Sequence, residues 1–511
     1  MFIPFPEWTP DIADLNNPGM TVAKNVIPGT SNYKPVPALA AVSDALTAYP
    51  RGAIAARDAP TGVSYNFAGD ATKLYTLGTT TDGIWDNVSK AAGYALGSEE
   101  GWSFTQFGDT VFAVAISETI QTYTMGTSTL FADIVSATGT APLARYIDTV
   151  HIDFLVVANT YDAVDGFKPA RVRWPGIGSS TTWAVSAVTQ ADYQDLDEKL
   201  GWITQLVGGD YATIYQEFGI TRMDYVGSPA IFQFTAIEGG SGTRYSKSII
   251  KVGSLQYYLG LDGFYVFDGN QSIPIGTDKV NTFFFDDLDA ENDHRITSAV
   301  DYINRLIVWS YPGSGNINGM PNRWLFYNFA PNAKLRWSYA EINNEYIFSS
   351  LTEGYTLDEL DAWETSHGIT PANLDLLPHD LDSRFWTGNQ LVFGSFDSDH
   401  KLAVSSTTDY LTAVLETAEV ELNEGQRTDL FRVMPYIDAN GYSSSVVTVE
   451  IGVRNLQSGA VTYGSPISLD ANGEIQCRSN ARFHRMRTNI AGGFKAAVGV
   501  KVLEAEPAGY R

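Results

Sequence analysis

Short strands separated by glycine-containing turns recur along most of this chain, and this feature limits what it can fold into. The stretch Tyr257–Val280, YYLGLDGFYVFDGNQSIPIGTDKV, contains bursts of aromatic and β-branched residues that Asp262–Gly263 and Asp268–Gly269 interrupt. Aspartate-glycine pairs between apolar runs are typical of tight turns between antiparallel strands. We therefore expect strands at Leu255–Leu259 and Phe264–Phe267, with the first of these turns between them.

The same turn-and-strand unit recurs from about residue 50 to about residue 405. It is seen at Phe67–Leu77, Gln106–Ala115, Tyr146–Ala158, Val207–Gly219, Lys251–Gly269, Val300–Tyr311 and Trp386–Val404. A degenerate repeat of about 40–50 residues is typical of a β-propeller, in which each sheet is covered by its neighbours. We predict an all-β fold whose residues 46–405 form an irregular β-propeller of about six to eight blades. Two β-sandwiches are the alternative.

One segment interrupts the β pattern. Leu357, Leu360 and Trp363 follow one another at helical spacing, and Thr356 with Glu359 matches a capping box. We predict a short helix and a loop, inserted into the propeller at about residues 356–383.

The two ends of the chain differ from the repeat. Residues 1–45 contain seven prolines, which prevent a long helix and favour an extended arm. Trp8 and Tyr33 are the candidate anchors of this arm, on its own chain or on a neighbouring subunit. Residues 406–511 alternate in five segments and predict a separate β-sandwich-like domain. Because this domain has too few strands to close two sheets, we expect the arm to pack with it.

Composition narrows the classes of function. A net charge of −25 repels nucleic acid from most of the surface and argues against a sequence-reading DNA-binding protein. The single cysteine, Cys477, excludes an intrachain disulfide and fits a reducing compartment. The amino-terminal sequence lacks the basic region of a signal peptide, and we find no apolar run long enough to span a membrane.

Motifs for catalysis are absent from the sequence. The six histidines have no zinc-ligand spacing, and we find neither a P-loop nor a G-x-S-x-G motif. We therefore predict no enzymatic activity and no cofactor, although a glycosidase pair is not identifiable by sequence among 58 acidic residues. The acidic run that contains Asp286, Asp287 and Asp289 is interpreted as a solvated loop. Calcium binding is the alternative, but the glycine and the closing glutamate of an EF-hand are missing.

The most basic part of the chain is its carboxy-terminal end, where seven Lys or Arg accompany three Asp or Glu over residues 471–511. Arg482, Arg485 and Arg487 form a candidate docking cluster around His484. In a strand, Arg485 and Arg487 share one face. This cluster fits a phosphate or DNA contact, pairing with acidic groups, or a solvated face.

Stretches at the start, middle and end of the chain resemble one family. They are FPEWTPDIADLNNPGMTVAKNVIPGTSNYKPVP from residue 5, GLDGFYVFDGNQSIPIGTDKV from residue 260, LDSRFWTGNQLVFGSFD from residue 381 and ARFHRMRTNIAGGFKAAVGVKV from residue 481. These stretches are similar to structural proteins of short-tailed bacteriophages, the tail nozzle and packaged-DNA stabilisation group. The shared motifs carry no catalytic residue.

The resemblance implies a virion protein of the tail, assembled in the host cytoplasm. Its subunits would combine a propeller with a β-rich platform and form a hexameric ring below the portal and adaptor rings, in contact with fibres or a needle. Double-stranded DNA would pass this ring without sequence-specific binding. In this interpretation Asp286, Asp287 and Asp289 are a candidate lumen-facing acidic loop, and the arginine cluster docks on a neighbouring ring. The alternatives are a tail-associated glycan-binding or glycan-degrading propeller and a monomeric interaction propeller.

Overall fold

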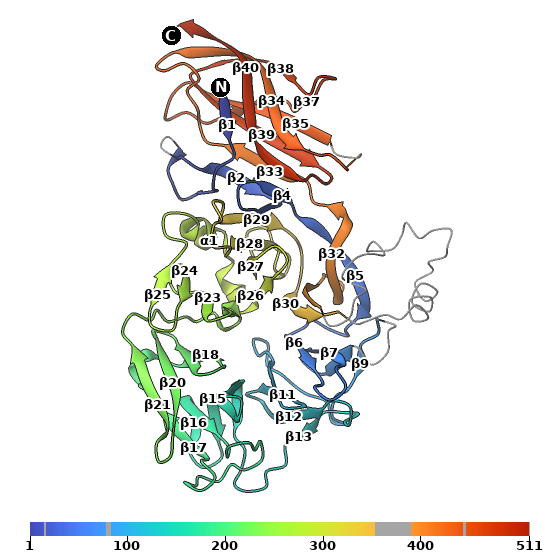
Figure 1. Cartoon of the computed structure of the whole chain (residues 1–511), viewed down its shortest axis with the longest axis vertical. Coiled ribbons are helices and arrows are strands. Elements are labelled where there is room, and N and C mark those ends of the chain that lie inside the picture. The colour runs from blue at the N-terminus through green and yellow to red at the C-terminus, as the bar shows by residue number, and fades with distance from the viewer. Residues whose placement is uncertain (15–16, 78–82, 353–389, 443–445, 510–511) are drawn as a thin grey trace, which may run out of the picture.

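The computed structural model describes residues 1–14, 17–77, 83–352, 390–442 and 446–509. The chain is built almost entirely of antiparallel β-sheets, arranged as a propeller with a second domain, the platform, at one end (Figure 1). The predicted helical insert at residues 356–383 lies outside the described residues.

Six separate four-stranded sheets and a seventh set of four strands form seven blades in the described part of the chain. Blade one comprises β6 (Gly52–Arg57), β7 (Ser64–Gly69), β8 (Leu74–Leu77) and β9 (Asp86–Asn87); blade two β10 (Ser103–Phe107), β11 (Thr110–Ala115), β12 (Glu118–Thr124) and β13 (Ala132–Asp133); blade three β14 (Leu143–Val150), β15 (Phe154–Asp162), β16 (Gly166–Trp174) and β17 (Asp192–Asp195). Blade four comprises β18 (Ile203–Val207), β19 (Ala212–Gln216), β20 (Gly219–Gly227) and β21 (Ile231–Ile237); blade five β22 (Ile250–Val252), β23 (Leu255–Leu259), β24 (Phe264–Phe267) and β25 (Ser272–Pro274); blade six β26 (Thr297–Asp301), β27 (Leu306–Tyr311), β28 (Arg323–Asn328) and β29 (Trp337–Glu341).

The first strands of neighbouring blades contact one another around an axis, with blade seven next to blade one; at blades four and five, β18 contacts η3 (Ser246–Ser248), which leads into β22. The predicted β-propeller is therefore confirmed, with seven blades. Strands β23 and β24 have the predicted bounds, and Gly263 between them has a φ of +156°. A Cβ atom at Gly263 would lie 1.9 Å from Asn281 Nδ2, so the turn requires glycine.

Blade seven joins the two ends of the propeller sequence. It combines β30 (Tyr346–Leu351), β31 (Leu391–Phe396) and β32 (Lys401–Tyr410) with β5 (Pro37–Ala45), which pairs with β32 at the sheet edge. The boundary predicted at residue 45 is therefore wrong, because residues 37–45 belong to the propeller. Proline is tolerated at the first residue of an edge strand, which is the position of Pro37 in β5.

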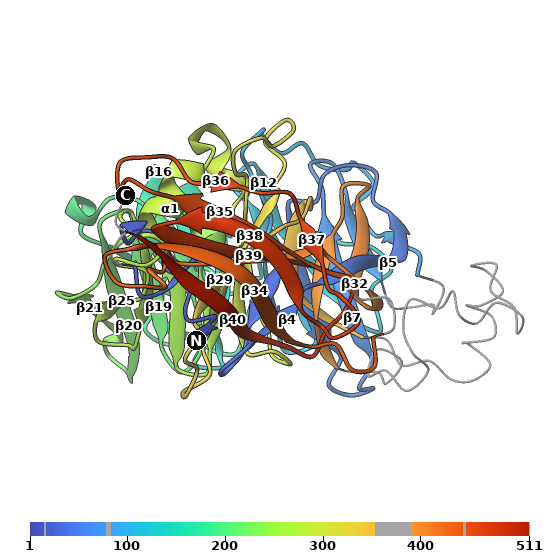
Figure 2. The same cartoon turned by 90° about the horizontal axis from the view of Figure 1, so that it is seen from above.

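The platform is a sandwich of two sheets to which both ends of the chain contribute (Figures 1 and 2). One sheet has the order β3–β4–β40–β34–β38, with β1 paired to β40; the other contains β33, β39, β35, β36 and β37. The strands from the arm are β1 (Phe2–Pro4), β2 (Met20–Lys24), β3 (Val26–Pro28) and β4 (Tyr33–Pro35). The carboxy-terminal strands are β33 (Ala413–Thr417), β34 (Arg427–Asp438), β35 (Val446–Arg454), β36 (Thr462–Tyr463), β37 (Ile467–Ser468), β38 (Ile475–Ala481), β39 (Phe483–Ala491) and β40 (Ala496–Gly509).

Strand β2 connects the platform to the propeller. It pairs in antiparallel fashion with β33 and in parallel with β29 at Lys24 and Tyr339, so blade six and the platform share one ten-stranded sheet. The arm packs with the carboxy-terminal domain, as expected, but it is not confined to that domain, because β2 also pairs with a propeller strand. One apolar cluster runs through this junction, where Trp309 stacks on Trp337 with ring centroids 6.0 Å apart.

Short helices occur only in connections within the described residues. They are α1 (Asn281–Asp287), η2 (Glu198–Leu200), η3 (Ser246–Ser248) and η4 (Ala290–Arg295). Helices α1 and η4 lie between blades five and six, and η3 leads into β22.

Candidate functional site at the axial channel

The acidic stretch that we expected to be a loop is helical. Asp286 and Asp287 are the last residues of α1, and Asp289 caps η4. The amino-terminal end of α1 is capped from far away in the sequence, because Asp11 of the arm accepts hydrogen bonds from two of its backbone N–H groups, both at 2.8 Å. This long-range cap supplies the acceptor that a helix start requires.

Two of the three carboxylates in this stretch are engaged within the chain. Asp287 pairs with the Arg323 guanidinium at 3.3 Å, and Asp289 accepts from the side-chain amides of Asn292 and Asn316 at 2.9 and 3.0 Å. These hydrogen bonds to Asn292 and Asn316 lower the pKa of Asp289. Of the three, only Asp286 is exposed, whereas Asp287 and Asp289 are partly buried, so the three do not form one free acidic surface.

The candidate docking cluster, with Arg485 and Arg487 in β39 and Arg482 just before it, is neutralised by its own domain. Arg487 pairs with Glu416 at 2.7 Å, and Arg485 pairs with Glu416 at 3.3 Å and with Glu419 at 3.1 Å. Arg482, the most exposed of the three, pairs with Glu421 at 2.9 Å. The strand register explains these pairs, because β33 places Glu416 directly opposite Arg487. Of the alternatives offered by the sequence, the structure shows pairing with acidic groups, which here belong to the same domain.

The two predicted arm anchors are fully buried within the chain. The ring of Trp8 lies 4.8 Å from Phe283 of α1 and 5.0 Å from Tyr339 of β29, centroid to centroid. The hydroxyl of Tyr33 donates to the carbonyl of Pro6 at 2.9 Å. These contacts fix the arm between the propeller and the platform.

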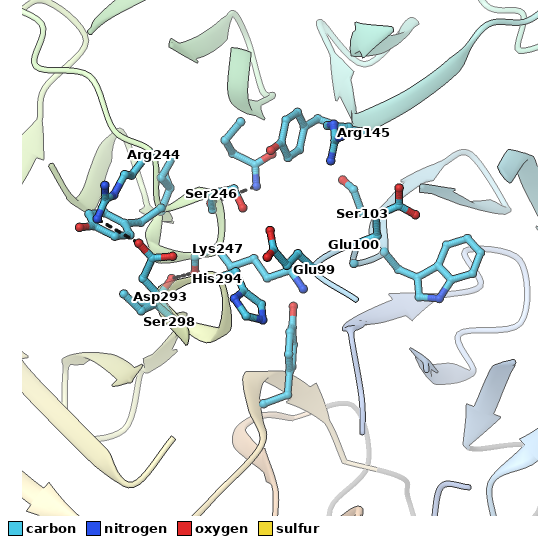
Figure 3. Close-up of a pocket in the computed structure, with 18 of the residues that line it drawn as sticks. Glu99, Glu100, Ser103, Arg145, Arg244, Ser246, Lys247, Asp293, His294 and Ser298 are labelled. Carbon is cyan, nitrogen blue, oxygen red and sulfur yellow. Dashed lines mark hydrogen bonds and ion pairs between the residues drawn. The ribbon is translucent and has the colours of Figure 1, made fainter. Parts of the chain in front are cut away.

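A cavity of about 440 Å³ lies on the propeller axis. Its wall comes from the first strands of the blades and from the loops that lead into them, including η3 and η4 (Figure 3). A smaller cavity of about 80 Å³ adjoins it and is lined by Tyr49, Arg51 and Arg295. The larger cavity has the concave shape and the size that are typical of ligand sites in proteins.

Lys247 is the central cation of this axial site. Its ammonium group donates to the carbonyl of Arg51 at 2.5 Å and lies 5.0 Å from the ring centroid of Tyr346. A Cβ atom at Gly101 would lie 2.5 Å from Lys247 Nζ, so a glycine there makes room for the ammonium. Burial, together with the charge of Arg51, lowers the pKa of Lys247 to about 7. Throughout the described residues, no carboxylate oxygen lies within 4 Å of this ammonium.

Three arginines near Lys247 also have no carboxylate partner among the described residues. Arg145 projects from β14, and its Nε is buried without a hydrogen-bond partner. Arg51 donates to the backbone carbonyls of Gly97 and Glu100. Arg295 donates to a backbone carbonyl at 2.9 Å and lies 4.8 Å from the ring of Tyr49.

The acidic groups of the axial site are engaged elsewhere or exposed. Asp293 pairs with Arg244 at 3.0 Å (Figure 3), and Glu100 accepts from Ser117 at 2.6 Å. Glu99 is exposed and points toward the centre of the cavity with His294. Burial and the neighbouring Arg295 lower the pKa of His294.

Our sequence reasoning missed this site. One signal was present: between Gly239 and Leu261 the chain has Arg244, Lys247 and Lys251 and no acidic residue, in a protein of charge −25. The other cations of the site lie in separate parts of the sequence, and only closure of the propeller brings them together.

Comparisons with known proteins leave the family open. No family model matches the chain, and no curated protein matches it. Among solved structures, the chain is similar to the extracellular domain of a putative one-component system from B. thetaiotaomicron, with 12% identity, a TM-score of 0.41, and coverage of 89% of this chain and 59% of that chain. A putative hybrid two-component system from B. thetaiotaomicron gives 8% identity over 86% of this chain and 47% of that chain, with a TM-score of 0.39. The chain thus spans about half of the length of these structures.

Two features are absent from the described parts of the chain. None of the helices there combines the length and the apolar character of a membrane span. No group of three or more His, Cys, Asp or Glu side chains in those parts is arranged to hold a metal ion.

Proposed function

We propose that this chain is a structural protein of a short bacteriophage tail. It forms the nozzle or hub ring below the portal and adaptor, retains the packaged DNA and conducts it during ejection. The observation that carries this proposal is the combination of domains: a propeller bears a platform that the amino-terminal arm and the carboxy-terminal region build together. The resemblance in sequence implies this same combination.

The DNA conduit lies between copies of the chain in this proposal. The propeller axis of one copy holds a cavity of about 440 Å³, which suits a small molecule and is too small for a duplex. A ring of six copies, closed by head-to-tail contacts, provides a wider passage. Other tail proteins, such as fibres or a needle, attach to this ring.

The distribution of charge supports passage of DNA without tight binding. The chain has a net charge of −25, and Arg482, Arg485 and Arg487 are paired with glutamates rather than free to bind phosphate. Because protein affinity for DNA depends on cations that neutralise phosphates, such a surface lets the duplex slide. The proposed function is structural and includes no catalytic step.

The proposal is tested by locating the chain in intact particles. Electron microscopy of particles that carry a tag on this chain should show six copies in a ring at the tail, directly below the adaptor. Particles assembled without the chain should lose their DNA to added nuclease, whereas complete particles protect it. A location outside the tail, or full DNA retention without the chain, would refute the proposal.

A separate assay addresses the glycan-degrading alternative. The purified chain is incubated with host surface polysaccharide, and released sugar is measured. The structural proposal expects no release; release that depends on one pair of carboxylates in the chain would favour the alternative.

A further inference from the structure

The axial site brings together four cations that form no ion pair within the described parts of the chain. Lys247 and Arg145 line the larger cavity, and Arg51 and Arg295 line the smaller one next to it. As described above, these four groups have no carboxylate within ion-pair distance among the described residues. What distinguishes the axial site is that these four cations line two adjoining cavities.

Such an arrangement is costly for a protein without a ligand. A partly buried cation loses hydration, and a nearby cation adds repulsion unless an opposite charge offsets both. The lowered pKa of Lys247 is the expected sign of this cost. The unpartnered Nε of Arg145 adds a buried donor without an acceptor, which destabilises a fold further.

We propose that the axial cavity binds a small multivalent oxyanion, either a phosphate or a di- or tricarboxylate. Lys247 and Arg145 bind this anion from two blades, and Arg51 and Arg295 attract it at the adjoining cavity. Arginine suits oxyanions of this kind because its planar fork donates two parallel hydrogen bonds. The proposal does not depend on the tail assignment.

The shape of the site limits the ligand. A cavity of about 440 Å³ accepts a molecule the size of citrate or a phosphorylated sugar, and excludes a folded nucleic acid or a protein segment. The exposed carboxylate of Glu99 at the centre disfavours an anion that fills the entire cavity. A compact ligand held on the side of Lys247 and Arg145 satisfies both limits.

Calorimetric titration of the full chain tests the proposal, with inorganic phosphate and citrate as separate probes at pH 6.5 and constant ionic strength. We expect at least one probe to bind, and Arg145→Gln and Lys247→Gln each to weaken that binding by about tenfold or more. Arg482→Gln is the matched control, because this cation pairs with Glu421 on the platform; it should leave the affinity unchanged. Preference for phosphate or for citrate identifies the chemical source of the ligand.

A measurement on the wild-type chain tests the proposed site even when a variant does not fold. Acetylation of Lys247 is followed by mass spectrometry with and without each probe, with the exposed Lys501 as the internal reference. Protection of Lys247 alone supports the site. Equal acetylation of Lys247 with and without both probes, or calorimetric binding that Arg145→Gln and Lys247→Gln leave intact, overturns the proposal.

Discussion

The clustered cations of the platform are paired with acidic groups, whereas those on the propeller axis are not. On the platform, Arg485 and Arg487 lie in β39 beside Glu416 of β33, and each guanidinium has an acidic partner. On the propeller axis, Lys247 and Arg145 face a cavity without one in the described structure. The platform cluster is conspicuous in the sequence, whereas the axial group is assembled from separate blades.

This difference teaches that clustering of cations along a sequence does not reveal which cations are free. In an antiparallel sheet, the residues that neutralise a strand come from its neighbours at positions set by the register. Glu416 and Glu450 lie opposite Arg487 from the two sides. The axial cations come from separate blades, where no strand register sets an acidic residue beside them, so they can stay unpaired.

The largest expected effect on stability comes from removing an acidic partner of the platform arginines. Glu416→Leu removes a carboxylate whose side chain is 2% exposed and leaves Arg485, at 8%, with a reduced counter-charge. We expect the free energy of unfolding to fall by about 3–5 kcal/mol, measured by urea denaturation. The control is Glu421→Leu, whose partner Arg482 is 43% exposed; it should cost less than about 1 kcal/mol. Equal losses would contradict the distinction.

A second prediction concerns His484, which is completely buried between the platform arginines and has no hydrogen-bond partner on either ring nitrogen. Burial lowers the pKa of His484 to about 4. Because the unfolded chain binds the proton more readily, stability should fall by about 3 kcal/mol as pH drops from about 6.5 to 4.

His484→Leu should remove most of this pH dependence and should stabilise the protein at pH 5. The exposed His151 supplies the control, since His151→Gln should keep the wild-type pH profile. Thermal unfolding measured at several pH values decides the matter; an unchanged profile in His484→Leu would show that another group causes it.

Removing the unpaired ammonium on the propeller axis should change the free energy of unfolding less. Lys247→Met removes an ammonium without a carboxylate partner while it keeps most of the side-chain volume. Without added anion, the free energy of unfolding should equal or exceed that of the wild type, by up to about 1 kcal/mol. Burial lowers the pKa of Lys247 to about 7, so wild-type stability should rise with pH above 7, and Lys247→Met should lose this rise. A clear loss of stability in Lys247→Met would mean that Lys247 has a structural role.

The smallest expected change in stability is at Asp286, the exposed member of the acidic stretch. Asp286→Lys should alter the free energy of unfolding by no more than about 0.5 kcal/mol. If this residue faces the DNA passage of a tail ring, the same substitution should slow ejection in a salt-dependent way. Ejection at the wild-type rate at every salt concentration would place Asp286 away from the DNA.

Features that depend on local chemistry could be predicted from the sequence. The strands at Leu255–Leu259 and Phe264–Phe267 have their predicted bounds, because a glycine with positive φ separates two apolar runs. The all-β class and the propeller follow from repetition of this unit. Strand alternation likewise identified the platform domain, since its period distinguishes a half-buried strand from a loop.

Features that depend on distant partners were decided only by the tertiary structure. Strand β5 closes blade seven with β32, Asp11 caps helix α1 from 271 residues away, and Glu416 neutralises Arg485 across 69 residues. The axial site likewise exists only because seven blades close around one axis. A sequence fixes which residues prefer a strand, a turn or an ion pair, since these preferences act over a few residues. The sequence does not indicate which distant residues come into contact, because these contacts depend on the packing of the whole chain.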